Sequence, residues 1–133
     1  MLFSGCSIPG GSEDAPNIIF LLTDDQRWDT MGCMGNEIIQ TPNMDRLADE
    51  GTLFTNNFVT TSICAPSRAS ILTGQYQRRH GIDDFSKEFS PDAWQQTYPM
   101  LLRDSGYHTG FVGKFGIQNN SPLPEDDFDF IVE

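Results

Sequence analysis

The sequence predicts an α/β fold, with a mainly parallel β-sheet lying between helices. An apolar run at residues 17–25 has the length and composition of a strand that is buried on both faces. Two segments with helix start and stop signals, residues 41–51 and 97–107, are each followed by a segment of β-type residues. Because helices that alternate with strands build layered folds with parallel sheets, we expect that architecture here.

The first predicted strand, "NIIFLLTDD" at residues 17–25, is entered from a proline and ends in two carboxylates. In the helix at residues 41–51, Thr41 is the expected cap, Pro42 the first residue and Gly51 the terminator. Residues 52–60 then form a strand or an extended segment that leads to Cys64.

The second half of the chain repeats this order of elements. A helix is predicted at residues 66–72, with Gly74 beyond its end. The helix at 97–107 begins near Thr97 or Tyr98 and stops at Gly106, and its inward residues are expected to be Leu101 and Leu102. The segment at 108–116, "HTGFVGKFG", is the next strand.

Composition limits the partners of the protein. The 133 residues suffice for one domain or a part of one, and 38% apolar content with ten phenylalanines is typical of a folding globular chain. The formal charge of −11 argues against nucleic acid and anionic membrane surfaces as partners. Three cysteines without clustered spacing indicate neither a disulfide framework nor a zinc site.

Four polar residues are predicted to share one edge of the sheet. Ligands of such sheets bind at the carboxyl ends of the strands, and this is where Asp24, Asp25, Cys64 and Lys114 fall. Adjacent aspartates on an extended backbone point apart, so Asp24 and Asp25 need a turn to reach one ion. Their hard oxygens suit Ca²⁺ or Mg²⁺. The alternative is a solvated turn or a helix cap.

Cys64 lies just before a predicted helix start, where backbone N–H groups and the helix dipole attract negative charge. Arg68 follows about one helical turn later, so its guanidinium would lie on the same face and bind an oxyanion. The alternative is a small buried thiol and an unrelated surface charge.

The string "CAPSRASILTG" at residues 64–74 resembles the signature of the type I, formylglycine-dependent sulfatases of the alkaline phosphatase superfamily. Further segments of the chain look like the same family, namely "PNIIFLLTDDQRWD", "TPNMDRLADEGTLFTNNF", "GYHTGFVGK" and "DDFDFIVE". The resemblance covers residues 16–133 and only the first part of a longer family domain, and it implies an alkaline-phosphatase-like sulfatase fold, incomplete here.

The resemblance implies a mechanism for Cys64. A separate formylglycine-generating enzyme would oxidise the cysteine to an aldehyde that hydrates to a geminal diol. One hydroxyl attacks the sulfur of the sulfate ester and expels the alcohol. The second hydroxyl then loses its proton, and the hydrated aldehyde collapses and releases sulfate. The implied substrates are sulfate esters, above all of carbohydrates.

The resemblance also assigns site residues. The catalytic set would be Cys64, Arg68 and Lys114, and the metal site, for Ca²⁺ or alternatively Mg²⁺, would be Asp24, Asp25 and the modified Cys64. Where the family commonly has a histidine, this chain has Gly116. We expect the 133 residues alone to be an incomplete enzyme. Two alternatives are a phosphonate or phosphodiester hydrolase of the same superfamily and a non-catalytic lipoprotein remnant.

Residues 1–15 are interpreted as the remnant of a leader or as a linker. "FSGC", ending at Cys6, resembles the cleavage box of bacterial lipoproteins, in which the cysteine is lipidated, although an accidental match is the alternative. The expected location is therefore periplasmic or otherwise extracytoplasmic, with a lipid anchor at Cys6.

Overall fold

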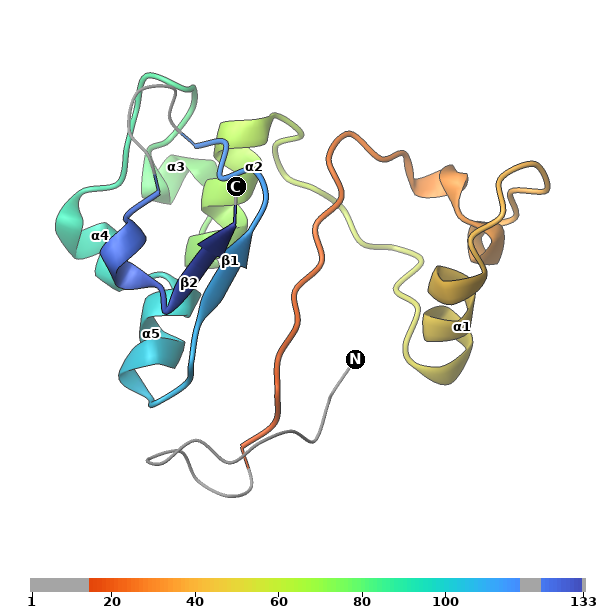
Figure 1. The fold of residues 1–133 in the computed structure, drawn as a ribbon. Helices are drawn as coiled ribbons and strands as arrows, with labels where there is room; N and C mark the ends of the chain where they lie inside the picture. The colour runs from red at the N-terminus through yellow and green to blue at the C-terminus, as the bar shows by residue number, and fades with distance from the viewer. Residues whose placement is uncertain (1–14, 118–122, 133) are drawn as a thin grey trace. The chain divides into compact units, whose positions relative to one another are not determined.

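The computed structural model describes residues 15–117 and 123–132, and Figure 1 shows their fold. Cys6 and the predicted cleavage box lie outside the described residues. The chain divides into two compact units, one containing Pro16–Phe58 and the other Val59–Glu133. Within the described residues, no helix has the length and apolar character needed to cross a membrane.

The first unit is organised around helix α1 (Pro42–Glu50) and two short 3-10 helices, η1 (Trp28–Thr30) and η2 (Gly32–Met34). As predicted, Thr41 precedes α1 and Gly51 follows it. The Thr41 hydroxyl does not cap the helix, however. It accepts from the Gly32 N–H at 2.8 Å and donates to Asp45 Oδ1 at 2.9 Å, so it ties η2 to α1.

The prediction of a buried strand at residues 17–25 is wrong. The segment is extended up to a bend at Asp24 and Asp25, but it carries no strand in the structure. Its apolar side chains, Ile18 to Leu22, are 44% to 79% exposed. A strand is defined by its ladder to a neighbour, and within the described residues no strand pairs with this segment. Residues 52–60 form an extended segment that contains a turn. Of the two predicted options, the extended segment is therefore the correct one.

Among the described residues, the second unit contains four α-helices and a parallel pair of strands. The helices are α2 (Cys64–Thr73), α3 (Gln77–His80), α4 (Pro91–Gln95) and α5 (Tyr98–Asp104). Strands β1 (Gly110–Val112) and β2 (Phe130–Val132) pair in parallel with Phe111 opposite Ile131, and the 3-10 helix η3 (Glu125–Asp127) precedes β2. Figure 1 shows β1 and β2 side by side. The predicted α/β class with a parallel sheet is confirmed. Among the described residues, this sheet consists of two strands.

The core of this unit lies between α2, α4, α5 and the segments that flank the strands. Its buried side chains come from all of these elements, and they are Ala65, Ala69, Leu72, Ile82, Trp94, Met100, Ile117, Leu123 and Phe128. Trp94 is central, because its ring lies 6.0 Å from that of Phe115 and 6.2 Å from that of Phe128. The core therefore fixes α2 against the segment that follows β1.

Helix α5 begins after Thr97 and is followed by Gly106 in the left-handed conformation, both as predicted. The prediction that Leu101 points inward is wrong, because Leu101 is 46% exposed. Pro99 and Met100 form the buried face instead. Consecutive residues of a helix differ by about 100° in direction, so a face centred on Met100 turns Leu101 away from the core.

Candidate functional site

Cys64 is the first residue of α2, with Ile63 as the N-cap. The sequence placed it just before the helix. The helix starts two residues earlier than predicted because Pro66 fits its first turn, where no intrahelical donor is needed. Ala65 and Ala69 are fully buried, whereas Cys64 and Arg68 are partly exposed. The burial of the alanines thus fixes the orientation of α2 and leaves the predicted site residues accessible.

Lys114 comes from the loop after β1 and reaches the start of α2. The Gly113 N–H donates to the Val132 carbonyl at 2.7 Å, which holds the beginning of this loop on the sheet. The Lys114 ammonium then donates to Cys64 Sγ at 3.7 Å. The structure therefore brings together two predicted site residues that are 50 positions apart in the sequence.

Arg68 contacts the same loop. Its Nη1 donates to the Lys114 carbonyl oxygen at 2.6 Å. A charge-assisted bond of this kind restrains both partners, so Arg68 holds the backbone whose side chain reaches Cys64. Within the second unit, Lys114 thus contacts both of the other residues predicted to be catalytic, Cys64 and Arg68.

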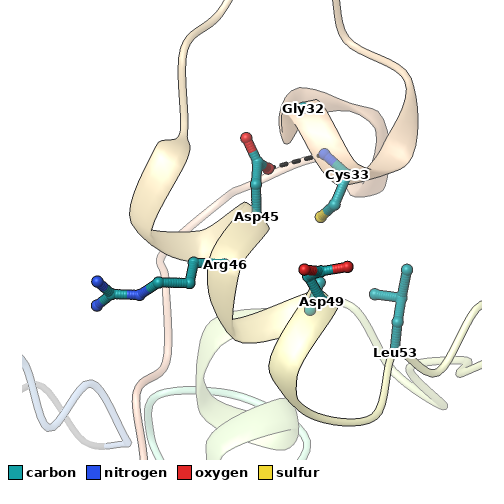
Figure 2. A pocket seen from close by; sticks show the side chains of 7 residues that line it. Gly32, Cys33, Asp45, Arg46, Asp49 and Leu53 are labelled. Atoms are coloured by element: carbon teal, nitrogen blue, oxygen red, sulfur yellow. Dashed lines mark hydrogen bonds between the residues drawn. The ribbon is translucent and has the colours of Figure 1, made fainter.

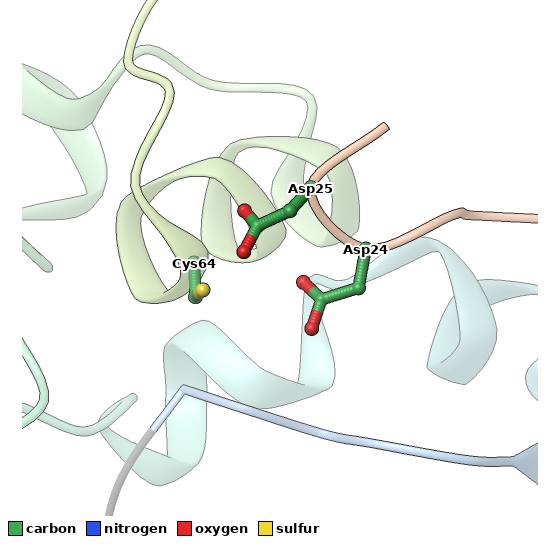
Figure 3. A group of neighbouring side chains, drawn as sticks. All are labelled: Asp24, Asp25 and Cys64. Atoms are coloured by element: carbon green, nitrogen blue, oxygen red, sulfur yellow. The ribbon is translucent and has the colours of Figure 1, made fainter. Parts of the chain in front are cut away.

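Asp24 and Asp25 lie on a bend of the first unit, as the sequence argument required. Asp25 has a φ of 51°, and a carboxylate oxygen of each residue lies within 4.8 Å of the other. Because oxygens bind Ca²⁺ at about 2.3–2.6 Å, two oxygens at this separation can reach one ion, and the pair fits a hard divalent cation. Figure 3 shows the two aspartates on this bend and Cys64 in the first turn of α2.

The first unit also has an open pocket of about 660 Å³ between η2 and α1, lined by Gly32, Cys33, Asp45, Arg46, Ala48, Asp49 and Leu53 (Figure 2). The Cys33 N–H donates to Asp45 Oδ1 at 2.7 Å, and this bond is the main cause that lowers the pKa of Asp45. Burial raises the pKa of the Cys33 thiol, and the hydrogen bond and the negative charge of Asp45 raise it further. No predicted site residue lines this pocket.

Sequence reasoning missed the pair formed by Ser70 and His80. The Ser70 hydroxyl lies 3.0 Å from His80 Nε2, and His80 Nδ1 accepts from the Ile82 N–H at 3.1 Å. This pair joins α2, which bears Cys64 and Arg68, to the end of α3. The sequence "QRRHG" contains the histidine before a left-handed glycine, Gly81, but no local pattern identifies Ser70 as its partner.

Comparison with known proteins agrees with this arrangement. The family model described as "Sulfatase" matches residues 16–133. The chain is 44% identical to an N-acetylglucosamine-6-O-sulfatase of Bacteroides thetaiotaomicron over 84% of its length, and 39% identical to an arylsulfatase of Clostridium perfringens over 77%. These alignments cover 20% and 21% of the two relatives, so the chain spans about a fifth of their length.

A solved structure gives the same result. It shows a protein in complex with its substrate D-glucosamine-2-N,6-O-disulfate, and it is similar to this chain with a TM-score of 0.72 and 41% identity. The match covers 86% of this chain and 22% of the other. The alkaline-phosphatase-like fold class predicted from the motif is confirmed by this likeness. With the family model matched over residues 16–133, the chain belongs to the sulfatase family.

Proposed function

We propose that this chain is the part of a sulfate ester hydrolase that carries the nucleophile, and that the substrate is a sulfated carbohydrate. The observation that carries the proposal is the contact of the Lys114 ammonium with Cys64 Sγ, at 3.7 Å and at the N-terminus of a ten-residue helix. Helix N–H groups and an ammonium together favour negative charge at this point. Similarity to an N-acetylglucosamine-6-O-sulfatase, and to a solved structure that holds D-glucosamine-2-N,6-O-disulfate, supports 6-O-sulfated glucosamine as the substrate class.

The second unit supplies three of the proposed roles. Cys64 is the precursor of formylglycine, made by a separate modifying enzyme, and the hydrated aldehyde supplies the nucleophilic hydroxyl. Lys114 binds the oxygens of the sulfate and stabilises charge that develops on them. Arg68 restrains the Lys114 backbone through the 2.6 Å bond to its carbonyl. The motif at residues 64–74 supports the role of Cys64, and the contacts of Lys114 and Arg68 support theirs.

Asp24 and Asp25 are proposed to hold a divalent cation, with Ca²⁺ preferred over Mg²⁺. The support is their oxygen chemistry and their separation of no more than 4.8 Å. Such a cation would neutralise charge on the sulfate and favour deprotonation of the attacking hydroxyl. An extracytoplasmic location and a lipid anchor at Cys6 stay predictions from the sequence.

Mass spectrometry of the protein, produced from its complete reading frame in the native host, tests the proposal. We expect the peptide that contains Cys64 to carry an aldehyde, and the enzyme to release sulfate from 6-O-sulfated N-acetylglucosamine. Cys64→Ala should abolish turnover, whereas the matched Cys33→Ala should keep it. An active enzyme with an unmodified thiol at Cys64 would contradict the mechanism. Faster hydrolysis of a phosphonate or a phosphate diester would contradict the substrate class.

A further inference from the structure

Gly116 lies two residues after Lys114, at a point where a side chain would crowd two neighbouring side chains. Its φ is +62°, in the left-handed region that favours glycine. A Cβ built at this position would lie 3.1 Å from Lys114 Cε and 3.2 Å from both Cδ and Nε of Arg68. Both neighbours are residues of the proposed site.

The two neighbours are bonded to each other, and Lys114 also contacts Cys64. Lys114 is held at both ends, by the contact of its ammonium with Cys64 at 3.7 Å and by the bond of its carbonyl to Arg68 at 2.6 Å. A side chain at residue 116 would push on Lys114 Cε, one bond from the ammonium nitrogen. A displacement of Cε would therefore also move the ammonium that contacts Cys64.

We propose that Gly116 is a positioning residue, and that its missing side chain lets the Lys114 ammonium reach Cys64. The proposal rests on the proposed function for the role of Lys114 in catalysis. What it predicts directly, however, is the position of the Lys114 ammonium beside Cys64 Sγ. It can therefore be tested on the unmodified thiol without turnover. It also gives a physical reason for Gly116 in this chain, since a larger residue would need a different backbone or a displaced lysine.

A charge beside a thiol can be measured by comparing two alkylating reagents. Iodoacetate is an anion and iodoacetamide is neutral, so a nearby ammonium accelerates the first relative to the second. We would produce the protein from its complete reading frame without the modifying enzyme. Mass spectrometry of the Cys64 peptide then gives the ratio of the two rates. The same digest reports Cys33, whose backbone N–H is bonded to the Asp45 carboxylate, as an internal reference.

Gly74 offers a matched control. Its φ of +65° is nearly that of Gly116, it ends the helix that Cys64 begins, and a Cβ there would meet nothing within 4 Å. Gly74→Ala and Gly116→Ala therefore introduce similar backbone strain, but only the second presses on Lys114. We expect Gly116→Ala to lower the rate ratio at Cys64 about twofold or more, and Gly74→Ala to leave it unchanged. Lys114→Met, which removes the charge, should lower it further.

Gly116→Asn keeps the test decisive if the alanine variant does not fold, because asparagine adopts the left-handed conformation more readily and carries the same Cβ. Variants at Gly116 that keep the wild-type ratio, or a Gly74→Ala variant that loses as much, would overturn the proposal. If the ratios behave as expected and the complete protein releases no sulfate, the positioning role stands and the proposed function fails.

Discussion

Ser70 on α2 and His80 at the end of α3 are joined by a hydrogen bond of 3.0 Å between the hydroxyl and Nε2. The other ring nitrogen, Nδ1, accepts from the Ile82 N–H at 3.1 Å. A neutral imidazole has one N–H, so we assign the proton to Nε2, which donates it to Ser70. An imidazolium has protons on both nitrogens and would lose the bond from Ile82.

Acidification should therefore destabilise the second unit. Burial lowers the pKa of His80 from its ordinary value of 6.5, so the unfolded chain takes up a proton at a higher pH than the folded one. The stability contributed by neutral His80 is thus fully present above pH 6.5 and is lost as the pH falls through the lowered pKa. Urea unfolding at a series of pH values should show this loss.

The histidine variants identify the group responsible. His80→Gln removes the titration and should flatten the dependence of unfolding free energy on pH below 6.5. His108→Gln removes the other histidine of the chain, which lies 3.3 Å from Asp129 Oδ2, and should leave the contribution of His80 to the slope in place. If the slope followed His108 and ignored His80, the assignment of this pH dependence to His80 would be wrong.

Trp94 should be the most sensitive position of the core. Its side chain is 6% exposed, and its indole N–H donates to Asp127 Oδ2 at 2.6 Å. Trp94→Phe keeps much of the aromatic packing but loses this bond, so we expect a loss of about 1–2 kcal/mol in unfolding free energy. Trp94→Ala should cost about 3–5 kcal/mol because it also leaves a cavity. Equal losses for the two variants in urea unfolding would argue against a role for the bond.

Arg68→Lys should separate charge from geometry at the proposed site. Lysine keeps the positive charge but lacks the fork of the guanidinium that bonds the Lys114 carbonyl at 2.6 Å. We expect the turnover of the complete, modified enzyme to fall about 100-fold, a typical loss when an oriented charge stabiliser is disturbed. Arg46→Lys, on α1 in the first unit, is the matched control. Steady-state kinetics with unchanged turnover in Arg68→Lys would exclude the restraint as a requirement.

The helices were predictable because their signals are local. Pro42 and Gly51 bracket α1, and Gly74 follows α2 in the left-handed conformation that glycine favours. The bend at Asp24 and Asp25 was also predictable, since two adjacent carboxylates on an extended backbone cannot share an ion. In each case the deciding interactions lie within a few residues of one another.

The remaining features depend on residues that are distant in sequence. The run at residues 17–25 has the composition of a strand, but a ladder needs a partner, and composition does not supply one. The approach of Lys114 to Cys64 was anticipated from the common edge of parallel strands and from the motif. The pair of Ser70 with His80 was not, because only folding brings the two side chains together. The closeness of Gly116 to the side chains of Lys114 and Arg68 likewise depends on the tertiary fold.

The Asp24 and Asp25 pair gives the last prediction. If these carboxylates hold Ca²⁺, Asp24→Asn and Asp25→Asn should each weaken calcium binding about tenfold or more in calorimetric titration of the complete protein, since affinity follows the charge of the ligands. Asp29→Asn is the matched control, because Asp29 lies on η1 of the same unit and is bonded to Arg27 at 2.6 Å. A site made by net negative charge alone would lose similar affinity in all three variants. Loss confined to Asp24 and Asp25 requires direct ligation, because the three substitutions remove the same charge.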